Sequence, residues 1–197
     1  MADAKKRCGW CGTDPLYVAY HDEEWGVPER DDDRLFEKLI LDGFQAGLSW
    51  ITILRKRAAF RQAFDDFDAQ KIARYTAAKK AALMRNAGII RSNAKIDATV
   101  GNARAYLKLR DGGASFSDYL WQFTDGQTLV NRNRTLSDVQ TQSPESVAMS
   151  KQLKKDGFKF CGPVICYAFM QATGMINDHV TACFRYDQVG KRTRKAR

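Results

Sequence analysis

The sequence predicts an all-α protein made of roughly eight to ten short helices. Three observations lead to this prediction. Apolar residues recur at intervals of three and four residues along most of the chain, which is the spacing of one helix face. Capping residues and glycines divide these periodic stretches into short segments. Few stretches alternate between apolar and polar residues, and only residues 128–130 suggest a turn of strand.

Two helices are predicted in the first third of the chain. Asp31 is a suitable N-cap, because two further acids and an apolar stripe over residues 35–40 follow it. A second helix is expected to begin near Trp50 and to end in the cations at positions 55–57, where positive charge complements the helix dipole.

Four helices are predicted in the middle of the chain. Asp68 and Thr76 are suitable N-caps for the first two, of which the second stops at Gly88. Helical periods over residues 92–109 and 116–123 indicate the other two.

Two further helices are predicted near the C-terminus. Ser143 with a proline after it marks the start of a helix that runs to Gly157. Residues 162–173 are rich in apolar side chains and end at Gly174. The polar segment 124–143 is the best candidate for a long loop.

The composition fits a single globular domain. The chain has 197 residues, of which 44% are hydrophobic, so it can bury a sizeable core. It has no apolar run long enough to span a membrane, and its first residues lack the apolar core of a signal peptide. We therefore expect a soluble, monomeric protein of the cytoplasm, whose five cysteines are thiols or metal ligands.

Positive charge is concentrated at the C-terminus. The formal net charge is +9, and the last seven residues, KRTRKAR, carry five positive charges. The expected organisation is one domain over residues 1–187, followed by a disordered basic tail over residues 188–197. A moderately basic body also suits an anionic partner such as DNA or RNA, although charge does not choose between them.

The two histidines of the chain belong to one candidate metal site. His179 and Cys183 are four residues apart, so on a helix they would share a face and could chelate one ion. Cys8 and His21 could supply two further ligands. A tetrahedral zinc site of this kind would join the N- and C-terminal segments, and a chance spacing without metal is the alternative.

The remaining cysteines have other interpretations. Cys8 and Cys11 have the spacing of a redox pair or of half a four-cysteine zinc site. A redox pair should follow a strand and open a helix, and a second pair of ligands with the same spacing is missing. Cys161 and Cys166 lie in an apolar stretch and are predicted to be small core residues.

A hairpin late in the chain is a candidate phosphate site. Gly157 and Gly162 bound a short turn between two predicted helices, and the second helix presents free backbone N–H groups at its start. Lys154, Lys155 and Lys159 stand beside it. This pattern is similar to a helix-hairpin-helix element that grips a nucleic-acid backbone, and an ordinary helix–helix turn with solvated lysines is the alternative.

Aromatic residues and one acid suggest a binding pocket. Trp10, Tyr20, Trp25 and Trp50 could enclose a planar group, and aromatic faces attract a cationic one. Asp42 lies between two helical segments with no cation nearby in the sequence. Core packing for the rings and a solvated helix end for the acid are the alternatives.

Seven blocks of sequence occur in an order that is similar to one enzyme family. Together they resemble the constitutive, type I family of bacterial DNA-3-methyladenine glycosylases over about residues 7–184. The blocks are RCGW, DPLYVAYHDEEWGVP, QAGLSWITILRKR, AGIIRSNAKI, GNARAYL, LKKDGFKFCGPVICYAFMQATG and NDHV.

The resemblance implies a fold and a metal site. The fold would be the all-α, two-lobed architecture of helix-hairpin-helix DNA glycosylases, with a DNA-facing cleft between the lobes. One structural zinc ion would fall on Cys8, His21, His179 and Cys183. Cys11 lies outside this set.

The resemblance also implies an activity and residues that perform it. The family hydrolyses the bond between 3-methyladenine and deoxyribose in double-stranded DNA after extruding the nucleotide. Asp42, Tyr20 and Trp50 would be the catalytic group, and Trp10 and Trp25 would complete the base-binding pocket.

The expected DNA contacts come from two turns. Gly47 and Leu48 would enter the gap that the extruded nucleotide leaves in the duplex. Gly157, Lys159 and Gly162 of the hairpin would hold the DNA backbone.

Two departures limit what the resemblance implies. The pocket acid of the family is usually glutamate, and Asp42 is one methylene shorter, which affects rate and selectivity but not the reaction class. Related glycosylases stabilise the sugar cation with an aspartate where this chain has Asn177. No lysine is indicated as a Schiff-base nucleophile, so a monofunctional enzyme is expected. The alternative is a zinc-stapled DNA-binding module whose catalysis is impaired.

Overall fold

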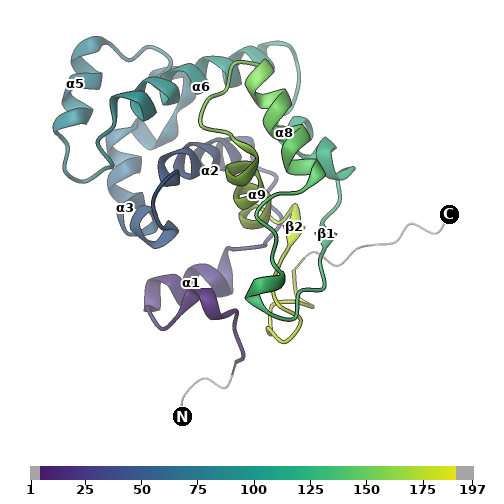
Figure 1. Ribbon diagram of the computed structural model, residues 1–197. Coiled ribbons are helices and arrows are strands. Elements are labelled where there is room, and N and C mark those ends of the chain that lie inside the picture. The colour runs from purple at the N-terminus through teal and green to yellow at the C-terminus, as the bar shows by residue number, and fades with distance from the viewer. Residues whose placement is uncertain (1–4, 190–197) are drawn as a thin grey trace.

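The computed structural model describes residues 5–189 and is mainly helical (Figure 1), as the sequence predicts. Two short strands, β1 (Leu129–Val130) and β2 (Ile176–Asn177), lie beside the helices. The α-helices of the described residues are α1 (Pro15–Glu23), α2 (Asp32–Gln45), α3 (Trp50–Ala63), α4 (Ala69–Ile72), α5 (Ala77–Arg85), α6 (Asn93–Asp111), α7 (Phe116–Trp121), α8 (Pro144–Lys155) and α9 (Pro163–Ala172).

The predicted helix starts are confirmed by their caps. The side chains of Asp31, Asp68, Thr76 and Ser143 each accept a hydrogen bond from a backbone N–H in the first turn of the following helix. Asp31 Oδ1, for example, accepts from Arg34 N at 2.9 Å. Each bond satisfies an N–H group that has no partner within the helix.

The helix that begins at Trp50 is longer than predicted. α3 continues through positions 55–57 to Ala63, because its buried face extends to Phe60 and Ala63. The two arginines at positions 55 and 57 form ion pairs with acids outside the helix, and Lys56 donates to backbone carbonyls. Arg57 Nη1, for example, lies 2.6 Å from Oε1 of Glu24, the residue that follows α1.

Helix α1 is absent from the sequence prediction. Asp14 caps it by accepting hydrogen bonds from Leu16 N and Tyr17 N, and Pro15 occupies its first position. A capping acid followed by proline is a common start signal, so the sequence did contain the information.

The helix that the sequence predicts for His179 and Cys183 is absent from the structure. Residues 179–183 form an irregular segment with a turn at positions 181–182 and not a helix, so the two side chains do not share a helix face. A backbone hydrogen bond from Cys183 N to Val180 O at 2.8 Å closes the turn. The turn brings the two side chains together by a different backbone path.

The predicted loop over residues 124–143 contains the strand suggested at 128–130. β1 pairs in parallel with β2, with Leu129 opposite Ile176. A 3-10 turn at Leu136–Asp138 follows within the same segment. The pairing ties this loop to the chain that leaves α9.

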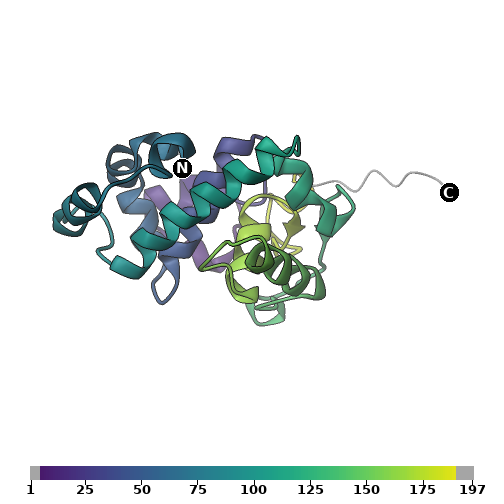
Figure 2. The same ribbon diagram turned by 90° about the horizontal axis from the view of Figure 1, so that it is seen from above.

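Helix α2 lies at the centre of the molecule (Figure 1) and packs against α3, α6, α7 and α9. Its buried side chains include Leu35, Phe36, Leu39 and Phe44. Viewed from above, α3 to α5 gather at one end and α8 and α9 at the other, with the long helix α6 between them (Figure 2). None of the helices within residues 5–189 combines the length and hydropathy that a membrane crossing needs.

A close backbone approach fixes the chain after α9. Gly174 has φ of +73°, and a Cβ atom there would lie 2.4 Å from Pro28 N. Glu29 N donates to Thr173 O at 3.1 Å beside this contact. Glycine is therefore required where the two segments cross.

Val189, the last described residue, lies two positions beyond the expected end of the domain at residue 187. Val189 is buried and its carbonyl accepts a hydrogen bond from Asn177 Nδ2 at 3.0 Å. The rest of the expected tail, residues 190–197, lies outside the described residues.

Candidate functional site

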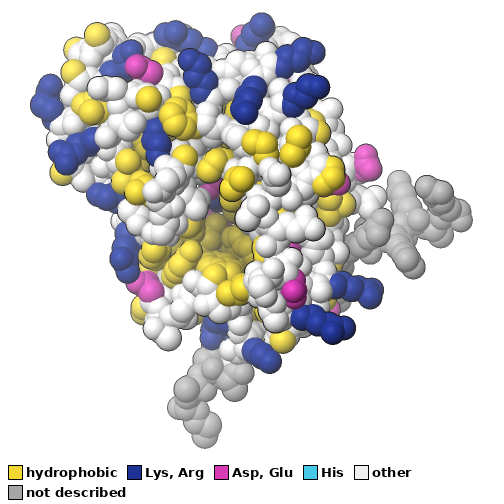
Figure 3. Space-filling view, in the orientation of Figure 1, with side chains coloured by type: hydrophobic (Ala, Val, Ile, Leu, Met, Phe, Trp, Pro, Cys, Tyr) yellow, Lys and Arg dark blue, Asp and Glu magenta, His cyan; other side chains and the backbone are white. Residues whose placement is uncertain are grey.

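A cavity of about 430 Å³ opens beside α1, α2, the start of α3 and α9. Figure 3 shows it as a hollow lined mainly by hydrophobic side chains. Its volume is within the range of small-molecule sites. The structure brings all five predicted pocket residues to its wall, namely Trp10, Tyr20, Trp25, Asp42 and Trp50.

The aromatic rings of the pocket pack on one another. The ring centroid of Trp10 lies 5.0 Å from that of Trp25 and 6.3 Å from that of Tyr20. The Tyr20 ring in turn lies 5.4 Å from the Trp50 ring. Such contacts are favourable and restrict ring motion. The pocket therefore offers preformed flat faces that can enclose a planar ligand and attract a cationic one.

Three buried polar atoms in the pocket wall have no hydrogen-bond partner among the described residues. They are Trp10 Nε1, Trp50 Nε1 and Asp42 Oδ2. Buried polar groups are usually paired, so unpaired ones in a cavity indicate contacts to a ligand or water. The pocket thus offers two N–H donors and one carboxylate acceptor to a bound molecule.

Asp42 has a cationic partner, which corrects the sequence prediction that no cation is near it. Lys38 lies one turn earlier on α2, and its ammonium binds Asp42 Oδ1. The Lys38 Nζ atom also lies 3.9 Å from the centroid of the Trp50 ring. Asp42 is buried and does not point into solvent as a helix end would.

Burial shifts the pKa of three neighbouring groups in the pocket wall, Asp42, Lys38 and Tyr20. It raises the pKa of Asp42, against the opposing effect of the Lys38 charge. It lowers the pKa of Lys38, against the opposing effect of the Asp42 charge. Burial also raises the pKa of Tyr20 well above its ordinary value. Tyr20 is therefore a neutral phenol at physiological pH.

The four predicted metal ligands converge at one buried point. The ligand atoms of Cys8, His21, His179 and Cys183 all lie within 4.8 Å of one another. Cys8 Sγ is 3.5 Å from His179 Nδ1, and Cys183 Sγ is 3.4 Å from His21 Nε2. Zinc bonds of about 2.3 Å to sulfur and 2.0 Å to nitrogen would separate such atoms by about 3.5 Å in a tetrahedron.

The other nitrogen of each imidazole has a partner of the kind found around metal sites. His21 Nδ1 lies 2.7 Å from Asp22 Oδ1, and Arg7 holds the same carboxylate. His179 Nε2 lies 3.2 Å from Trp25 O. These contacts orient both rings with one nitrogen toward the cluster.

The cluster favours the thiolate of Cys183, whereas the hydrogen bond to Cys183 and burial raise the pKa of the Cys8 thiol. The hydrogen bond from Cys8, assisted by bonds from His179 and His21, lowers the pKa of the Cys183 thiol. Cys11 lies outside the cluster, and its Sγ donates to Cys8 O at 3.1 Å. The residues present therefore fit a divalent ion with two sulfur and two nitrogen ligands.

The comparisons with known proteins agree with one another. The model of the methyladenine glycosylase family matches residues 10–186. The chain belongs to the methyladenine glycosylase family. It is 52% identical over 181 residues to DNA-3-methyladenine glycosylase 1 of Escherichia coli, covering 92% of this chain and 97% of that protein. It is 50% identical to DNA-3-methyladenine glycosylase of Haemophilus influenzae, covering 90% and 96%.

Solved structures give the same result for the fold. A crystal structure of 3-methyladenine DNA glycosylase I (TAG) is 51% identical, has a TM-score of 0.90 and covers 91% of this chain and 98% of its own. A substituted 3-methyladenine DNA glycosylase I in complex with 3-methyladenine is 37% identical with a TM-score of 0.88, covering 91% and 97%.

The residues that are predicted to contact DNA lie on two turns of this methyladenine glycosylase. Gly47 has φ of +82°, and the neighbouring Leu48 side chain is 42% exposed, although large and apolar. Lys95 Nζ supports this turn by donating to Phe44 O at 2.8 Å and to Ala46 O at 2.7 Å. An apolar side chain on a supported turn suits insertion between bases.

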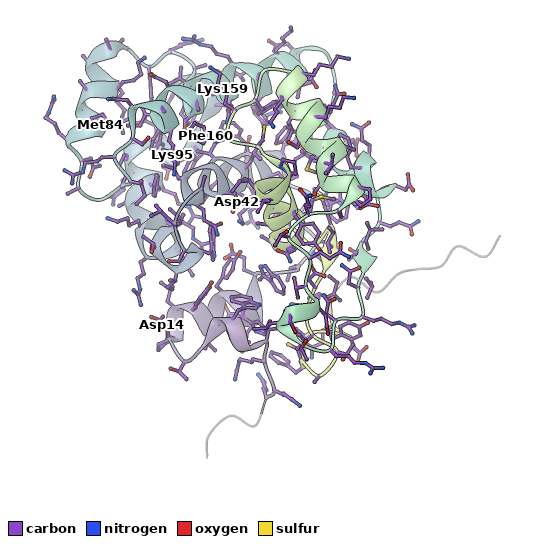
Figure 4. All side chains as sticks on the ribbon, viewed as in Figure 1. Asp14, Asp42, Met84, Lys95, Lys159 and Phe160 are labelled. Carbon is purple, nitrogen blue, oxygen red and sulfur yellow. The ribbon has the colours of Figure 1, made fainter. Side chains whose placement is uncertain are left out.

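The hairpin between α8 and α9 is held from α6. Asn102 donates to Lys159 O at 3.1 Å and accepts from Lys159 N at 2.8 Å. Gly157 has φ of +97°, and Gly162 precedes the proline that opens α9. Figure 4 shows Lys159 and Phe160 together on this hairpin, on the α6 side of Asp42. The predicted turn geometry is therefore present.

Several pocket residues of this methyladenine glycosylase are absent from the sequence prediction. The most informative is Tyr17, which lies three residues before Tyr20 on α1. Residues three apart share a helix face, so a prediction of α1 would have placed Tyr17 beside Tyr20. Asp178 also lines the pocket, where it accepts a hydrogen bond from Tyr167 Oη at 2.7 Å. The residues in question are Tyr17, Lys38, Gln45, Tyr167, Gln171 and Asp178.

Asn177, which the resemblance matches to the sugar-stabilising aspartate of related glycosylases, is not among the residues that line the ring-lined pocket. Its side chain donates to Tyr186 O at 2.9 Å and to Val189 O at 3.0 Å. Its own oxygen accepts from His179 N. Asn177 therefore organises the turn that carries the metal-cluster histidine.

Proposed function

We propose that this chain is a monofunctional DNA glycosylase that hydrolyses the N-glycosidic bond of 3-methyladenine in alkylated double-stranded DNA. The observation that carries the proposal is the ring-lined cavity with a buried carboxylate and unpaired N–H donors. The complex of a related glycosylase with 3-methyladenine supports it. We further propose that it acts as a monomer in the cytoplasm.

The reaction needs little chemical activation by the protein. Methylation at N3 makes the base of the nucleotide a cation, so the bond between C1′ and N9 breaks with its electron pair neutralising the leaving base. Water adds to the oxocarbenium-like C1′ and releases a proton. The protein must extrude the nucleotide and hold its base. In this proposal Tyr20 and Trp50 contact the faces of the base, and Trp10 and Trp25 enclose it.

Asp42 supplies the charge that favours a cationic base. Its unpaired Oδ2 can accept a hydrogen bond from the amino group of the base. The pocket acid of the family is usually glutamate, and aspartate places its carboxylate about 1.5 Å closer to its own backbone. A bridging water can span that difference, so we expect a change in rate and selectivity with the same reaction.

The DNA duplex would contact the two exposed turns. Leu48, next to Gly47, would fill the gap left by the extruded nucleotide. The hairpin of Gly157, Lys159 and Gly162 would bind the backbone through N–H groups and positive charge, as in helix-hairpin-helix proteins. Residues 1–187 would then form one domain with two lobes and the pocket between them.

The metal cluster would hold one structural zinc ion. Cys8, His21, His179 and Cys183 would be its four ligands, and with all positions filled by protein it would supply a cross-link and no catalysis. It would join the segment before α1 to the segment after β2. Since both segments carry pocket residues, the ion would add to the stability of the folded pocket without taking part in the reaction.

The proposed enzyme would lack strand-cleaving lyase activity. A lyase step needs a neutral amine that attacks C1′. Among the described residues that line the pocket, Lys38 is the one lysine, and its ammonium is bound to Asp42 and faces Trp50. The Lys38 ammonium therefore lies where the base is proposed to bind and not where C1′ of the sugar would lie.

A second candidate function is a zinc-stapled DNA-binding module with impaired catalysis. The Lys38–Asp42 ion pair favours it, because the pair fills part of the pocket. Incubation with methylated duplex DNA separates the two candidates. The glycosylase releases free 3-methyladenine above the spontaneous rate, and Asp42→Asn releases it more slowly. The module binds the duplex without release.

A further inference from the structure

Lys38 stands in the wall between two cavities. Its side chain lines the ring-lined pocket and also a second cavity of about 430 Å³, whose α2 residues lie about one turn nearer the start of the helix. Within the pocket its ammonium contacts the two groups that a cationic ligand would use, namely the Asp42 carboxylate and the face of Trp50. The pocket therefore contains an internal cation at the place where a cationic base should bind.

We propose that Lys38 is a specificity-determining residue: a cationic base enters the pocket by displacing its ammonium from Asp42 and Trp50. This inference rests on the proposed function, because it assumes that the pocket receives a base. One cation replaces another in the exchange, so the charge inside the pocket is unchanged and Asp42 always has a partner.

The exchange explains how the pocket would reject undamaged bases. A neutral adenine that displaced Lys38 would leave the Asp42 carboxylate buried with no counter-charge, which is strongly unfavourable. A neutral base that left Lys38 in place would lose access to the Trp50 face. Only a base with its own positive charge can replace both interactions of the ammonium.

The second cavity can receive the displaced ammonium. It is lined by four glutamates and three arginines, so it carries one excess negative charge when Lys38 is left out of the count. Each arginine pairs with one glutamate, the distances being 3.5 Å for Arg34 and Glu29, 2.6 Å for Arg57 and Glu24, and 2.9 Å for Arg61 and Glu37, which leaves Glu23. A lysine side chain that turns from one cavity to the other would balance the remaining charge.

Binding of two small ligands tests the exchange without DNA. The probe with a fixed charge is 3,9-dimethyladeninium, whose second methyl group stands for the deoxyribose and keeps the ring cationic. The neutral probe is 3-methyladenine, which loses its ring proton. Dissociation constants for both would be measured by calorimetry with the full chain, with Lys38→Met, and with Lys38→Arg, which keeps the charge.

The proposal predicts that Lys38→Met binds the cationic probe at least about tenfold more tightly than the parent, because no internal cation competes with it. The neutral probe should change by less than about threefold, so the ratio of the two constants shifts. Lys38→Arg should not tighten cation binding. Lys71→Met is the matched control, since it removes one charge from an exposed side chain outside the pocket.

An unchanged or weaker affinity of Lys38→Met for the cationic probe would overturn the proposal. Lys38→Ala, compared with the parent after both have given cooperative melting curves, repeats the test if methionine disturbs the pocket. Failure of the proposed function is a separate result, because it is seen when the parent protein releases no base from methylated DNA.

Discussion

Loss of the metal cluster should destabilise the fold more than it alters the chemistry. In the variant His179→Ala one of the four proposed ligands is removed, and Trp25 O loses the contact with His179 Nε2. We expect the purified variant to contain little zinc. Cys11→Ser is the matched control, because Cys11 is a buried thiol beside the cluster but not one of its ligands.

The size of the effect follows from the loop that the ion closes. Cys8 and Cys183 enclose about 175 residues, and closing a loop of that length removes about 5 kcal/mol of unfolded-state entropy by the cross-link formula. This value is an upper limit, because Phe184 N also donates to Lys6 O at 2.9 Å and holds the same ends. A loss of about 2–5 kcal/mol should lower the melting temperature by roughly 5–20 °C.

Three measurements on the same samples test this reasoning. Metal analysis gives the zinc content, a thermal melt gives the stability, and base release well below the melting temperature gives the activity. The variant should retain most of its activity at low temperature. If it contains no zinc but melts within about 2 °C of the parent, the ion is not structural and the loop argument is wrong.

Three further predictions concern the fold, the pocket acid and the reaction. Gly174→Ala should cost about 2–4 kcal/mol in urea unfolding, since strained φ and the contact with Pro28 both contribute, whereas Gly126→Ala should cost only about 1 kcal/mol because nothing lies near its Cβ position. Equal losses of stability in the two variants would show that the close contact with Pro28 does not contribute. Burial raises the pKa of Asp42, so base release should fall as the pH decreases, and the fall should begin above the usual pKa range of aspartate. The variant Asp42→Asn should not show this fall on the acid side. The same fall in the variant would assign it to another group. Borohydride should trap no covalent complex with DNA, and a complex that persists would contradict the monofunctional assignment unless it formed equally on intact DNA.

Helix starts could be predicted from the sequence because capping is local chemistry. Asp31 and Ser143 each bond to N–H groups three residues away, so the sequence contains the whole interaction. The sequence contains the same kind of local signal at Asp14, which caps α1 and is followed by proline. The Lys38–Asp42 pair was also accessible, because the two residues are one helix turn apart.

Other parts of the site depend on tertiary contacts that a single sequence does not reveal. Tyr167 reaches the pocket from α9, which packs on α2, and Asp178 reaches it from the chain that follows the close crossing at Gly174. His179 and Cys183 meet through a turn and not through a helix, so the spacing was right and its explanation was wrong. Residue types were thus more predictable than the backbone path that assembles them.

The proposed function is tested most directly by a crystal structure of this protein with 3-methyladenine. The base is expected in the ring-lined pocket, in contact with the Tyr20 and Trp50 rings and within hydrogen-bond reach of Asp42 directly or through one water. A base bound outside this pocket, or a pocket that stays without base at saturating ligand, would contradict it.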